Sequence, residues 1–320
     1  MPFIAEILKQ KSLAVVGLEK NCGKTECLNY ILERIPAQSC RACITSIGID
    51  GESIDQVTRT KKPEIVLKEG NYFSTSESHY RLRNLTSEIV GISNETTALG
   101  RIITARVVSK GKVILSGPSS TQSLRRWMDE TEHFGIDLTI IDGALSRISS
   151  ASPAVSTSMI LATGAALSSN MATLIAKTAF AVDMIHLPLY DSSISDLDTN
   201  AIELSSLSGD YDISPDCRRV YVSGALTDRL LKKLLQEKNL GEMELVVKDF
   251  TRIFITPQTY NMWVRYGGKL RVQMQSNLLA VCVNPLSPSG YVLDSDTLCR
   301  ELSARIALPV YDIVKNKYEA

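Results

Sequence analysis

The sequence predicts an α/β protein built on a doubly wound, mostly parallel β-sheet. Three observations lead to this fold class. Short apolar runs alternate with segments of helical periodicity, glycine or proline ends many of these segments, and the strand-like runs are almost continuously apolar. Strands that are buried on both faces have such a composition, because helices cover both sides of a parallel sheet.

Four strand-like runs occur in the first half of the chain, at residues 12–17, 42–49, 112–117 and 137–142. Helical periodicity marks residues 23–35, 97–111 and 119–135. Pro36 ends the first of these helices, and a glycine ends each of the other two. Between residues 50 and 96 the alternation weakens, so we expect a small insertion of short strands and loops, such as a hairpin.

The alternation resumes in the second half of the chain. A strand followed by a helix is expected within residues 158–185, 218–241 and 278–308. The stretch 189–216 is rich in serine and aspartate and is the best candidate for a boundary. We therefore predict a core of residues 1–188, a linker at 189–216, and a C-terminal α/β part at 217–320 that continues or flanks the same domain.

Composition and charge exclude several classes of protein. The chain has 320 residues, of which 44% are hydrophobic, and its 35 basic residues balance its 35 acidic residues. No net positive field therefore favours nucleic acid or an anionic membrane. No apolar run reaches the roughly 18 residues of a membrane span, and the amino terminus lacks the apolar core of a secretion signal. We expect a cytoplasmic protein whose partners are neither nucleic acid nor membrane.

The seven cysteines are scattered and odd in number, which is typical of reduced thiols. Cys40 and Cys43 form a single C-x-x-C pair. A zinc or redox site would require a second pair or nearby histidines, and the sequence shows neither. We therefore expect these thiols to be structural.

The stretch VVGLEKNCGKTECLNYI, residues 15–31, joins the first strand to the first helix through a turn, the glycine loop (residues 17–25). Phosphate oxygens need several donors at once, and backbone N–H groups at the start of a helix supply them. Gly23 permits close approach of the backbone, Lys24 neutralises phosphate charge, and Thr25 offers a hydroxyl to Mg²⁺. The expected nucleotide-binding residues are Gly17, Glu19, Lys20, Asn21, Cys22, Gly23, Lys24, Thr25, Glu26 and Asn284.

The glycine loop departs from the usual G-x-x-x-x-G-K-[ST] pattern. Gly17 lies one residue earlier than the first glycine of that pattern, and Leu18 takes its place. This lengthened form resembles the loop of dethiobiotin synthetase, within the P-loop class that contains the partitioning and metal-insertion ATPases. Several members of that class carry an extra lysine early in the loop, a part that Lys20 would play here with a different spacing. The resemblance implies a P-loop NTPase fold with Mg²⁺ as a cofactor.

Carboxylates follow two other predicted strands. Asp142 ends the run LTIID, the place of the Walker-B acid that orients Mg²⁺ through water. Asp50 and Glu52 follow the second strand, where the P-loop class has an acid near the metal and the attacking water. The carboxyl ends of parallel strands meet at one edge of the sheet, so these segments converge.

These positions predict both a catalytic set and a metal site. We expect Lys24, Asp50 and Asp142 to act in catalysis. We expect Thr25, Asp50, Glu52 and Asp142 to form the metal site. The alternative for Asp50 and Asp142 is that each is a solvated acid in a loop, since short strand–acid patterns recur by chance.

The base is expected to be adenine. Guanine-specific P-loop proteins read the base with an Asn-Lys-x-Asp motif, and the nearest string, NKYE at residues 316–319, lacks the aspartate. This absence favours ATP as the cofactor. Asn284, near the end of the predicted strand 278–285, either donates to a purine edge or completes a turn before Pro285.

Further strings along the chain resemble a small bacterial family. These strings are GLEKNCGKT, SIGIDGE, TKKPEIVL, GRIITARV, LSGPSS, IIDGALSRISSASP and ILATGAALS. They are similar to the P-loop subunits of the reactivase for the adenosylcobalamin-dependent lysine 5,6-aminomutase and the related ornithine aminomutase. The resemblance covers about residues 12–320 and is strongest before about residue 170.

This resemblance implies a chaperone-like ATPase that helps to release damaged cobalamin from a B12-dependent aminomutase. Its expected partners are the aminomutase and a second reactivase subunit that resembles MutS ATPases, and a homodimer is compatible with this role. Three alternatives stay open: a ligase or carboxylase like dethiobiotin synthetase, a GTPase chaperone for cobalamin enzymes, and a scaffold that holds nucleotide. Asp50 and Glu52 occupy the place of the lysine with which the ligase grips its anionic substrate, which disfavours the ligase.

Overall fold

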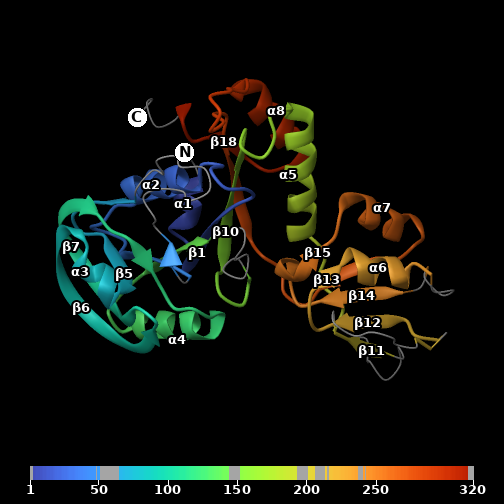
Figure 1. Cartoon of the computed structure of the whole chain (residues 1–320), viewed down its shortest axis with the longest axis horizontal. Coiled ribbons are helices and arrows are strands. Elements are labelled where there is room, and N and C mark those ends of the chain that lie inside the picture. Colours follow the sequence, from blue (N-terminus) through green and yellow to red (C-terminus); the bar gives the residue numbers. More distant parts are fainter. Residues whose placement is uncertain are drawn as a thin grey trace. The chain divides into compact units, whose positions relative to one another are not determined.

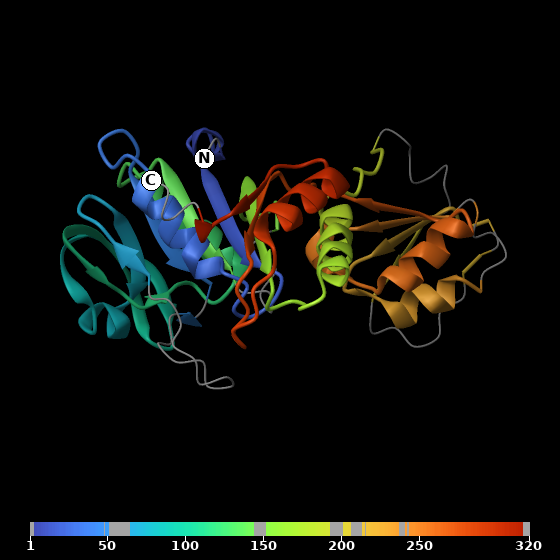
Figure 2. The same cartoon turned by 90° about the horizontal axis from the view of Figure 1, so that it is seen from above.

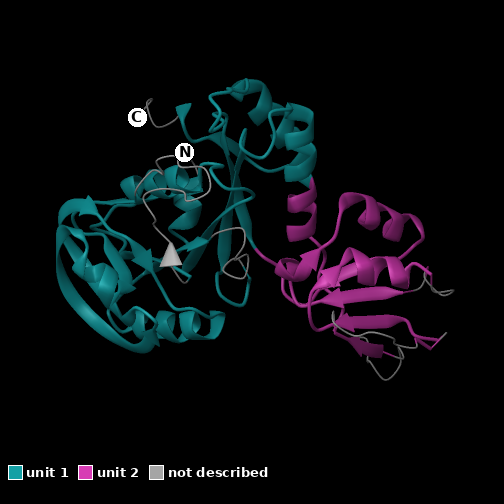
Figure 3. Ribbon diagram, in the orientation of Figure 1, with its two compact units in different colours: residues 1–179, 277–320 teal, residues 180–276 magenta. Residues whose placement is uncertain are grey.

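The computed structural model describes residues 3–47, 49–50, 65–143, 152–192, 201–205, 213–214, 216–236, 241 and 243–315, with the backbone alone at 49–50. The chain divides into two compact units (Figure 3). Unit 1 comprises Met1–Ala179 and Asn277–Ala320, and unit 2 comprises Phe180–Ser276. Each unit has its own sheet and its own hydrophobic core.

Unit 1 is built on a ten-stranded mixed sheet (Figure 1). Its strands follow the order β18 (Val310–Asp312), β17 (Leu278–Asn284), β10 (Ser158–Gly164), β1 (Ser12–Gly17), β9 (Leu138–Gly143), β2 (Ala42–Ser46), β5 (Tyr72–Ser76), β7 (Gly100–Lys112) and β4 (Val66–Leu67), and β6 (Asn84–Thr97) pairs with β7. The strands from β18 through β5 are parallel, whereas β7 is antiparallel to each of its partners. The predicted α/β fold with a mostly parallel sheet is therefore confirmed.

The helices in the described part of unit 1 are α1 (Phe3–Ile7), α2 (Lys24–Arg34), α3 (Glu77–Arg81), α4 (Thr121–Glu132), α8 (Ser295–Ile306) and the first part of α5 (Met171–Ile185). They cover both faces of the sheet. Neighbouring residues of a strand point to opposite faces, and two neighbours in β2 pack against different helices. Ile44 of β2 belongs to the same core cluster as Ile31 of α2. The preceding residue, Cys43, belongs to the cluster of Trp127 of α4. Within the described residues, no helix combines the length and the apolar character that crossing a bilayer requires.

Residues 97–111, predicted as a helix, form most of β7 instead, so that prediction is wrong. β6 and β7 make a long antiparallel hairpin at the end of the sheet opposite β18 (Figure 2). Ile102, Ile103 and Thr104 are β-branched, and such side chains favour strands. The backbone of β7 pairs with β5 on one side and with β6 on the other, which periodicity alone does not reveal. The insertion expected at 50–96 therefore extends through Lys112, and within it β5 is a parallel strand of the main sheet.

The strand predicted at residues 112–117 is also not a strand of the parallel sheet. Lys112 ends β7, and Leu115–Ser116 forms the short strand β8. β8 pairs antiparallel with β3 (Ile49–Asp50) in a separate two-stranded sheet. The other strands and helices predicted for unit 1 are present, with boundaries shifted by a few residues.

Unit 2 contains a parallel sheet of its own. Its strands follow the order β11 (Ala201–Leu204), β12 (Arg219–Val222), β14 (Glu244–Val247) and β16 (Lys269–Val272). Its other described elements are the paired strands β13 (Leu226–Thr227) and β15 (Ile253–Phe254), the short helix η4 (Phe250–Arg252), the helices α6 (Asp228–Leu234) and α7 (Pro257–Arg265), and the second part of α5.

The structure divides the chain at positions other than the predicted ones. β11 lies inside the expected linker, 189–216, yet it is a strand of the unit 2 sheet. Residues 277–320 return to unit 1, where β17, α8 and β18 complete its edge. A polar stretch marks a break in apolar periodicity, but it does not show that the chain later returns to its first sheet.

Gly164, at the end of β10, lies against the neighbouring strand β17. A Cβ atom at this position would be 2.1 Å from the carbonyl oxygen of Asn284. We expect Gly164→Ala to lower the free energy of unfolding by about 1–3 kcal/mol, the usual effect of overpacking between constrained backbones. Urea denaturation measures the change. Gly241→Ala is the control, because the nearest atom to its Cβ position is 3.7 Å away. Equal losses in both variants would contradict this explanation.

Candidate functional site

Four parallel strands bring parts of the predicted site to one edge of the unit 1 sheet. β9 and β10 flank β1, and β17 follows β10. The glycine loop begins at the end of β1, Asp142 lies one residue before the end of β9, and Asn284 ends β17. Because the strands are parallel, these ends share one edge of the sheet, which is where ligands bind in open α/β folds.

The glycine loop turns toward α2 through two residues in the left-handed conformation. Asn21 has a φ of 61° and Gly23 has a φ of 92°. The N–H group of Leu18 donates to the carbonyl of Ala162 in β10 at 2.9 Å, which anchors the start of the loop. Gly23 is the N-cap residue of α2 and supplies no side chain to cap the first turn. Backbone N–H groups in such a turn at the start of a helix form an anion site.

Both glycines of the loop allow close packing. A Cβ atom at Gly23 would lie 2.8 Å from Cβ of Asn284, and one at Gly17 would lie 2.6 Å from Sγ of Cys22. Cys22 is almost fully buried against the end of β1. The loop therefore folds back over the strand from which it comes, and Gly17 lies beneath the turn.

The side chains of Lys24 and Asp142 form a buried ion pair. Nζ of Lys24 lies 2.6 Å from Oδ1 of Asp142, and the two side chains are 16% and 3% exposed. A carboxylate with so little exposure is stable when a cation neutralises it, because a lone buried charge is strongly unfavourable. Two of the three predicted catalytic residues are thus in contact.

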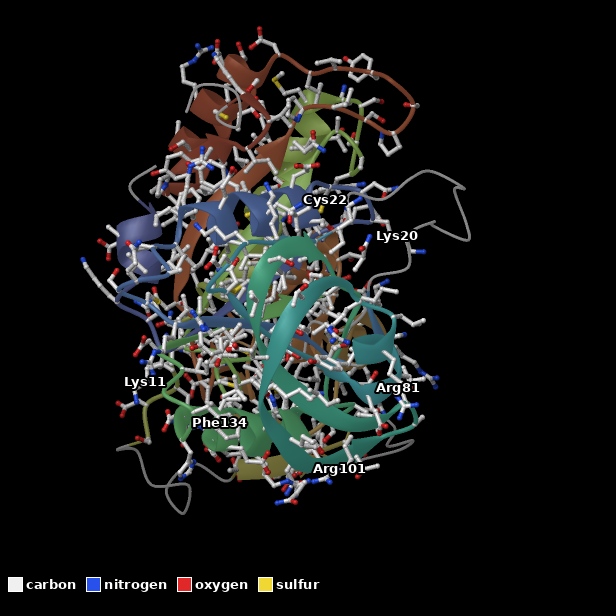
Figure 4. The ribbon with its side chains drawn as sticks, turned by 90° about the vertical axis from the view of Figure 1, so that its left-hand side faces the viewer. Lys11, Lys20, Cys22, Arg81, Arg101 and Phe134 are labelled. Carbon is white, nitrogen blue, oxygen red and sulfur yellow. The ribbon has the colours of Figure 1, made fainter. Side chains whose placement is uncertain are left out.

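The remaining loop residues surround this pair. Thr25 is half-buried at the start of α2, and its hydroxyl has no hydrogen-bond partner among the described residues. Glu26 is half-buried in the same turn. Oε1 of Glu19 accepts from the N–H group of Lys20 at 2.9 Å. Lys20 is exposed and makes no ion pair with any described residue (Figure 4).

Asn284 lies beside the start of α2. Its Nδ2 atom is 3.3 Å from the Cβ position at Gly23, and its Oδ1 atom accepts from the N–H group of Leu286 at 3.0 Å. The side chain therefore completes the turn after β17, one of the two alternatives that the sequence left open. Its Nδ2 donor lies near the glycine loop, and its contact with a purine stays a prediction.

The acids of the second strand are only partly placed. The backbone at Asp50 belongs to β3, where it pairs with Leu115 of β8. The side chain of Asp50 and the whole of Glu52 lie outside the described residues. Their assignment to catalysis and to the metal therefore stays a prediction.

The cysteines are free thiols, and six of the seven are buried. Burial raises the pKa of Cys40 to about 11 and that of Cys43 to about 12, so both sulfurs are protonated at neutral pH. Burial also raises the pKa of Cys22, although the backbone of Glu19 and the charge of Lys24 oppose it. Reactive and metal-binding cysteines are thiolates, and the described residues contain no group of three or more histidine, cysteine, aspartate or glutamate side chains that could hold a metal ion. Cys40 and Cys43 pack in two hydrophobic core clusters of unit 1.

A cluster of hydroxyl groups around His79 was not predicted from the sequence. Nδ1 of His79 lies 2.8 Å from Oγ of Ser116, and Oγ of Ser76 lies 2.6 Å from the same atom. The N–H group of Ser76 donates to Oγ of Ser116 at 3.1 Å. Ser76 ends β5, so the cluster lies at the same edge of the sheet as the glycine loop.

This cluster joins β8 to β5. The Ser116 hydroxyl already has several partners, which suits a structural role better than that of a nucleophile. Burial lowers the pKa of His79 from its ordinary value of 6.5, so the imidazole is neutral at pH 7. The serine-rich stretches STSESH and LSGPSS are the sequence signal for this cluster, but only the folded structure shows that they meet.

Comparisons with known proteins identify no relative of this chain. No family model, no curated protein and no solved structure matches it. Any function must therefore be argued from the residues and from their geometry.

The Lys24–Asp142 pair predicts a specific pattern of stability. Lys24→Ala leaves Asp142 buried without this cation, so we expect the free energy of unfolding to fall by about 3 kcal/mol. Adding Asp142→Asn removes the buried charge and should restore most of that loss. Urea denaturation of wild type, Lys24→Ala and Lys24→Ala/Asp142→Asn tests the pattern. Lys9→Ala, which breaks the exposed pair of Lys9 and Glu6, is the control and should change stability by less than about 1 kcal/mol.

His79 predicts a dependence of stability on pH. Its pKa is lowered in the folded protein, so the unfolded chain binds more protons as the pH falls below about 6.5. The stability that His79 contributes is complete above that pH and is lost as the pH falls through its folded pKa. We expect wild type to lose more stability than His79→Gln between pH 7.5 and pH 5.5. Equal losses in urea denaturation, with His133→Gln as the control, would contradict this.

Proposed function

We propose that the glycine loop binds the phosphates of ATP together with Mg²⁺ and that the protein hydrolyses ATP. The observation that carries the proposal is the buried pair of Lys24 and Asp142 beside a loop whose backbone suits an anion. If an anion alone drew Lys24 away, Asp142 would lose the cation that pairs with it while its carboxylate stays buried, which is unfavourable. A phosphate that arrives with a divalent cation avoids this difficulty, because it supplies both an anion for Lys24 and a cation for Asp142.

The residues of the site fit these two ligands. Thr25 offers an unused hydroxyl at the start of α2, and Asp142 offers a carboxylate, so these two residues would hold Mg²⁺. Bound Mg²⁺ would neutralise charge on the phosphate oxygens. Lys24 would contact the β- and γ-phosphates, and Lys20 is an exposed second cation on the same loop. Asp50 and Glu52 would complete the acidic side of the site.

The ion pair also suggests how nucleotide would affect the rest of the protein. Lys24 begins α2 and Asp142 lies at the end of β9, so exchange of their partners changes a contact between two elements. We propose that nucleotide binding orders the segments after Asp50 and Asp142, which lie outside the described residues, and that hydrolysis releases them. Such order–disorder changes are how many NTPases act on partners.

The role of reactivase is a finer proposal that depends on the resemblance of the sequence strings alone. In this role the protein would act with a MutS-like ATPase subunit to release damaged cobalamin from a B12-dependent aminomutase. A ligase like dethiobiotin synthetase is the second candidate, and the acids Asp50 and Glu52 at its substrate position disfavour it. A GTPase is disfavoured by the missing guanine motif. A scaffold that holds nucleotide would bind ATP without turnover.

Nucleotide binding is tested by thermal unfolding with Mg²⁺ and either ATP or GTP. Ligand at 100 times its dissociation constant stabilises by about 2.7 kcal/mol, so we expect MgATP to raise the melting temperature by roughly 5–10 °C. The double variant Lys24→Ala/Asp142→Asn, which should fold, is expected to show no shift. Arg125→Ala, outside the site, should behave as wild type. A shift of equal size in the double variant would refute the site.

The function is tested by release of cobalamin. The protein, ATP and the MutS-like subunit are incubated with an aminomutase that holds hydroxocobalamin, and free cobalamin is measured by its absorbance after filtration. Release that requires both ATP and Lys24 supports the reactivase. A carboxylated product from ATP, bicarbonate and a diamino acid would support the ligase. ATP binding with no hydrolysis and no release would leave the scaffold.

A further inference from the structure

A groove in the β6–β7 hairpin of unit 1 has the character of a binding site. Its volume is about 370 Å³, and it is lined by side chains of α3, β6, β7 and the segment between α3 and β6. Three arginines, Arg81, Arg83 and Arg101, and three isoleucines contribute to it, against a single acid, Glu77. Figure 4 shows Arg81 and Arg101 beside the hairpin. We call it the hairpin groove.

Two of the arginines carry charge that no described acid neutralises. Glu77 pairs with Arg81, whose Nη2 atom lies 2.6 Å from Oε1 of that acid. Arg83 and Arg101 form no ion pair with any residue in the described part of the chain. The hairpin groove therefore has an excess of positive charge where carboxylates would be bound by charge-assisted hydrogen bonds.

The Arg83 and Arg101 guanidinium groups are held in position by neutral partners. Nε of Arg83 donates to Ser87 Oγ at 3.0 Å, Nη1 donates to the carbonyl of Tyr80 at 2.8 Å, and the group lies 3.9 Å from the centre of the Tyr80 ring. Nε of Arg101 donates to the carbonyl of Ser93 at 3.2 Å. A guanidinium that is already ordered loses less entropy when it binds a carboxylate.

Apolar side chains lie next to these charges. Ile89 and Ile92 are 52% and 48% exposed, whereas Ile103 beside them is buried. A small carboxylate needs no such surface. The combination selects a ligand that has both acidic and apolar groups.

The backbone of β6 favours a peptide as that ligand. β6 pairs with β7 alone among the described strands, so its outer edge has backbone groups available for an added strand. Its only charged residues, Glu88 and Glu95, already pair with Arg106 and Arg126, and it contains neither lysine nor proline to protect the edge. The register between β6 and β7 shifts after Ile89 and after Ile92. A strand added at the outer edge of β6 would therefore pair regularly over only a short stretch.

We propose that the hairpin groove binds a short extended segment of a partner protein in which acidic and apolar residues occupy every second position, so that both kinds of side chain lie on the same face. Acidic side chains pair with Arg83 and Arg101, and apolar side chains cover Ile89 and Ile92. A second copy of this chain is a poorer occupant. Its hairpin would bring the same arginines, and the acids Glu77, Glu88 and Glu95 of that hairpin already pair with arginines. The inference is independent of nucleotide binding, since none of these residues belongs to the glycine loop.

The probe is a fluorescein-labelled decapeptide in which aspartate and valine take turns at every second position, with serine between them, so that both face the same side. A decapeptide with lysine in place of each aspartate is the comparison. Fluorescence anisotropy should show saturable binding of the acidic peptide in the micromolar range, and at least tenfold weaker binding of the basic one. We expect Arg83→Ala/Arg101→Ala to weaken binding of the acidic peptide at least tenfold. Ile92→Asp, at an exposed position, should weaken it similarly without loss of thermal stability.

The matched control is Lys9→Ala/Arg125→Ala, which removes two positive charges outside the hairpin groove. Its binding should stay within twofold of wild type. Equal weakening in both double variants would show attraction by net charge alone and would overturn the proposal. Absence of saturable binding would also overturn it. A dimer in sedimentation that Ile92→Asp abolishes would assign the surface to a second copy instead.

Discussion

The contact between Lys24 and Asp142 depends on the adjacency of two parallel strands. β1 and β9 are neighbours, and Val15 of β1 lies opposite Asp142. This register brings the carboxylate to the level at which β1 gives way to the glycine loop, so the first residue of α2 can reach it. A buried acid and a buried lysine are each unfavourable alone, and together they fix the start of α2 relative to the sheet.

Close backbone approaches hold the opposite side of the site. Asn284 lies against Gly164 of β10 through its carbonyl oxygen and against Gly23 of the glycine loop through its side chain. Both glycines leave space that a Cβ atom would occupy. The end of β17 is therefore fixed between its neighbouring strand and the start of α2. The glycine loop thus gains a defined shape from the strands beneath it.

The proposed site and the hairpin groove lie in different parts of unit 1. The site forms at the carboxyl ends of the central strands, where parallel sheets commonly bind ligands. The hairpin groove forms where the sheet changes to antiparallel pairing and ends in an edge strand. Unit 2 contributes none of the described residues of either feature. Under the two proposals, unit 1 would use separate surfaces for chemistry and for a partner, and only the first was visible as a sequence motif.

Local pattern by itself determined the strands and helices around the glycine loop. β1, β2, β9 and β10 are buried along their whole length, so apolar runs identified them, and Gly23, Lys24 and Thr25 marked the turn. Local pattern failed at β7, whose apolar spacing also fits a helix. The contacts that make this segment a strand are its pairings with β5 and β6. Local pattern also grouped residues 277–320 with 217–276 in one C-terminal part, whereas these two segments belong to different units. Only the tertiary structure decided that Lys24 meets Asp142, that His79 meets Ser116, and that Arg83 and Arg101 share a groove, because each of these contacts joins segments that no local periodicity connects.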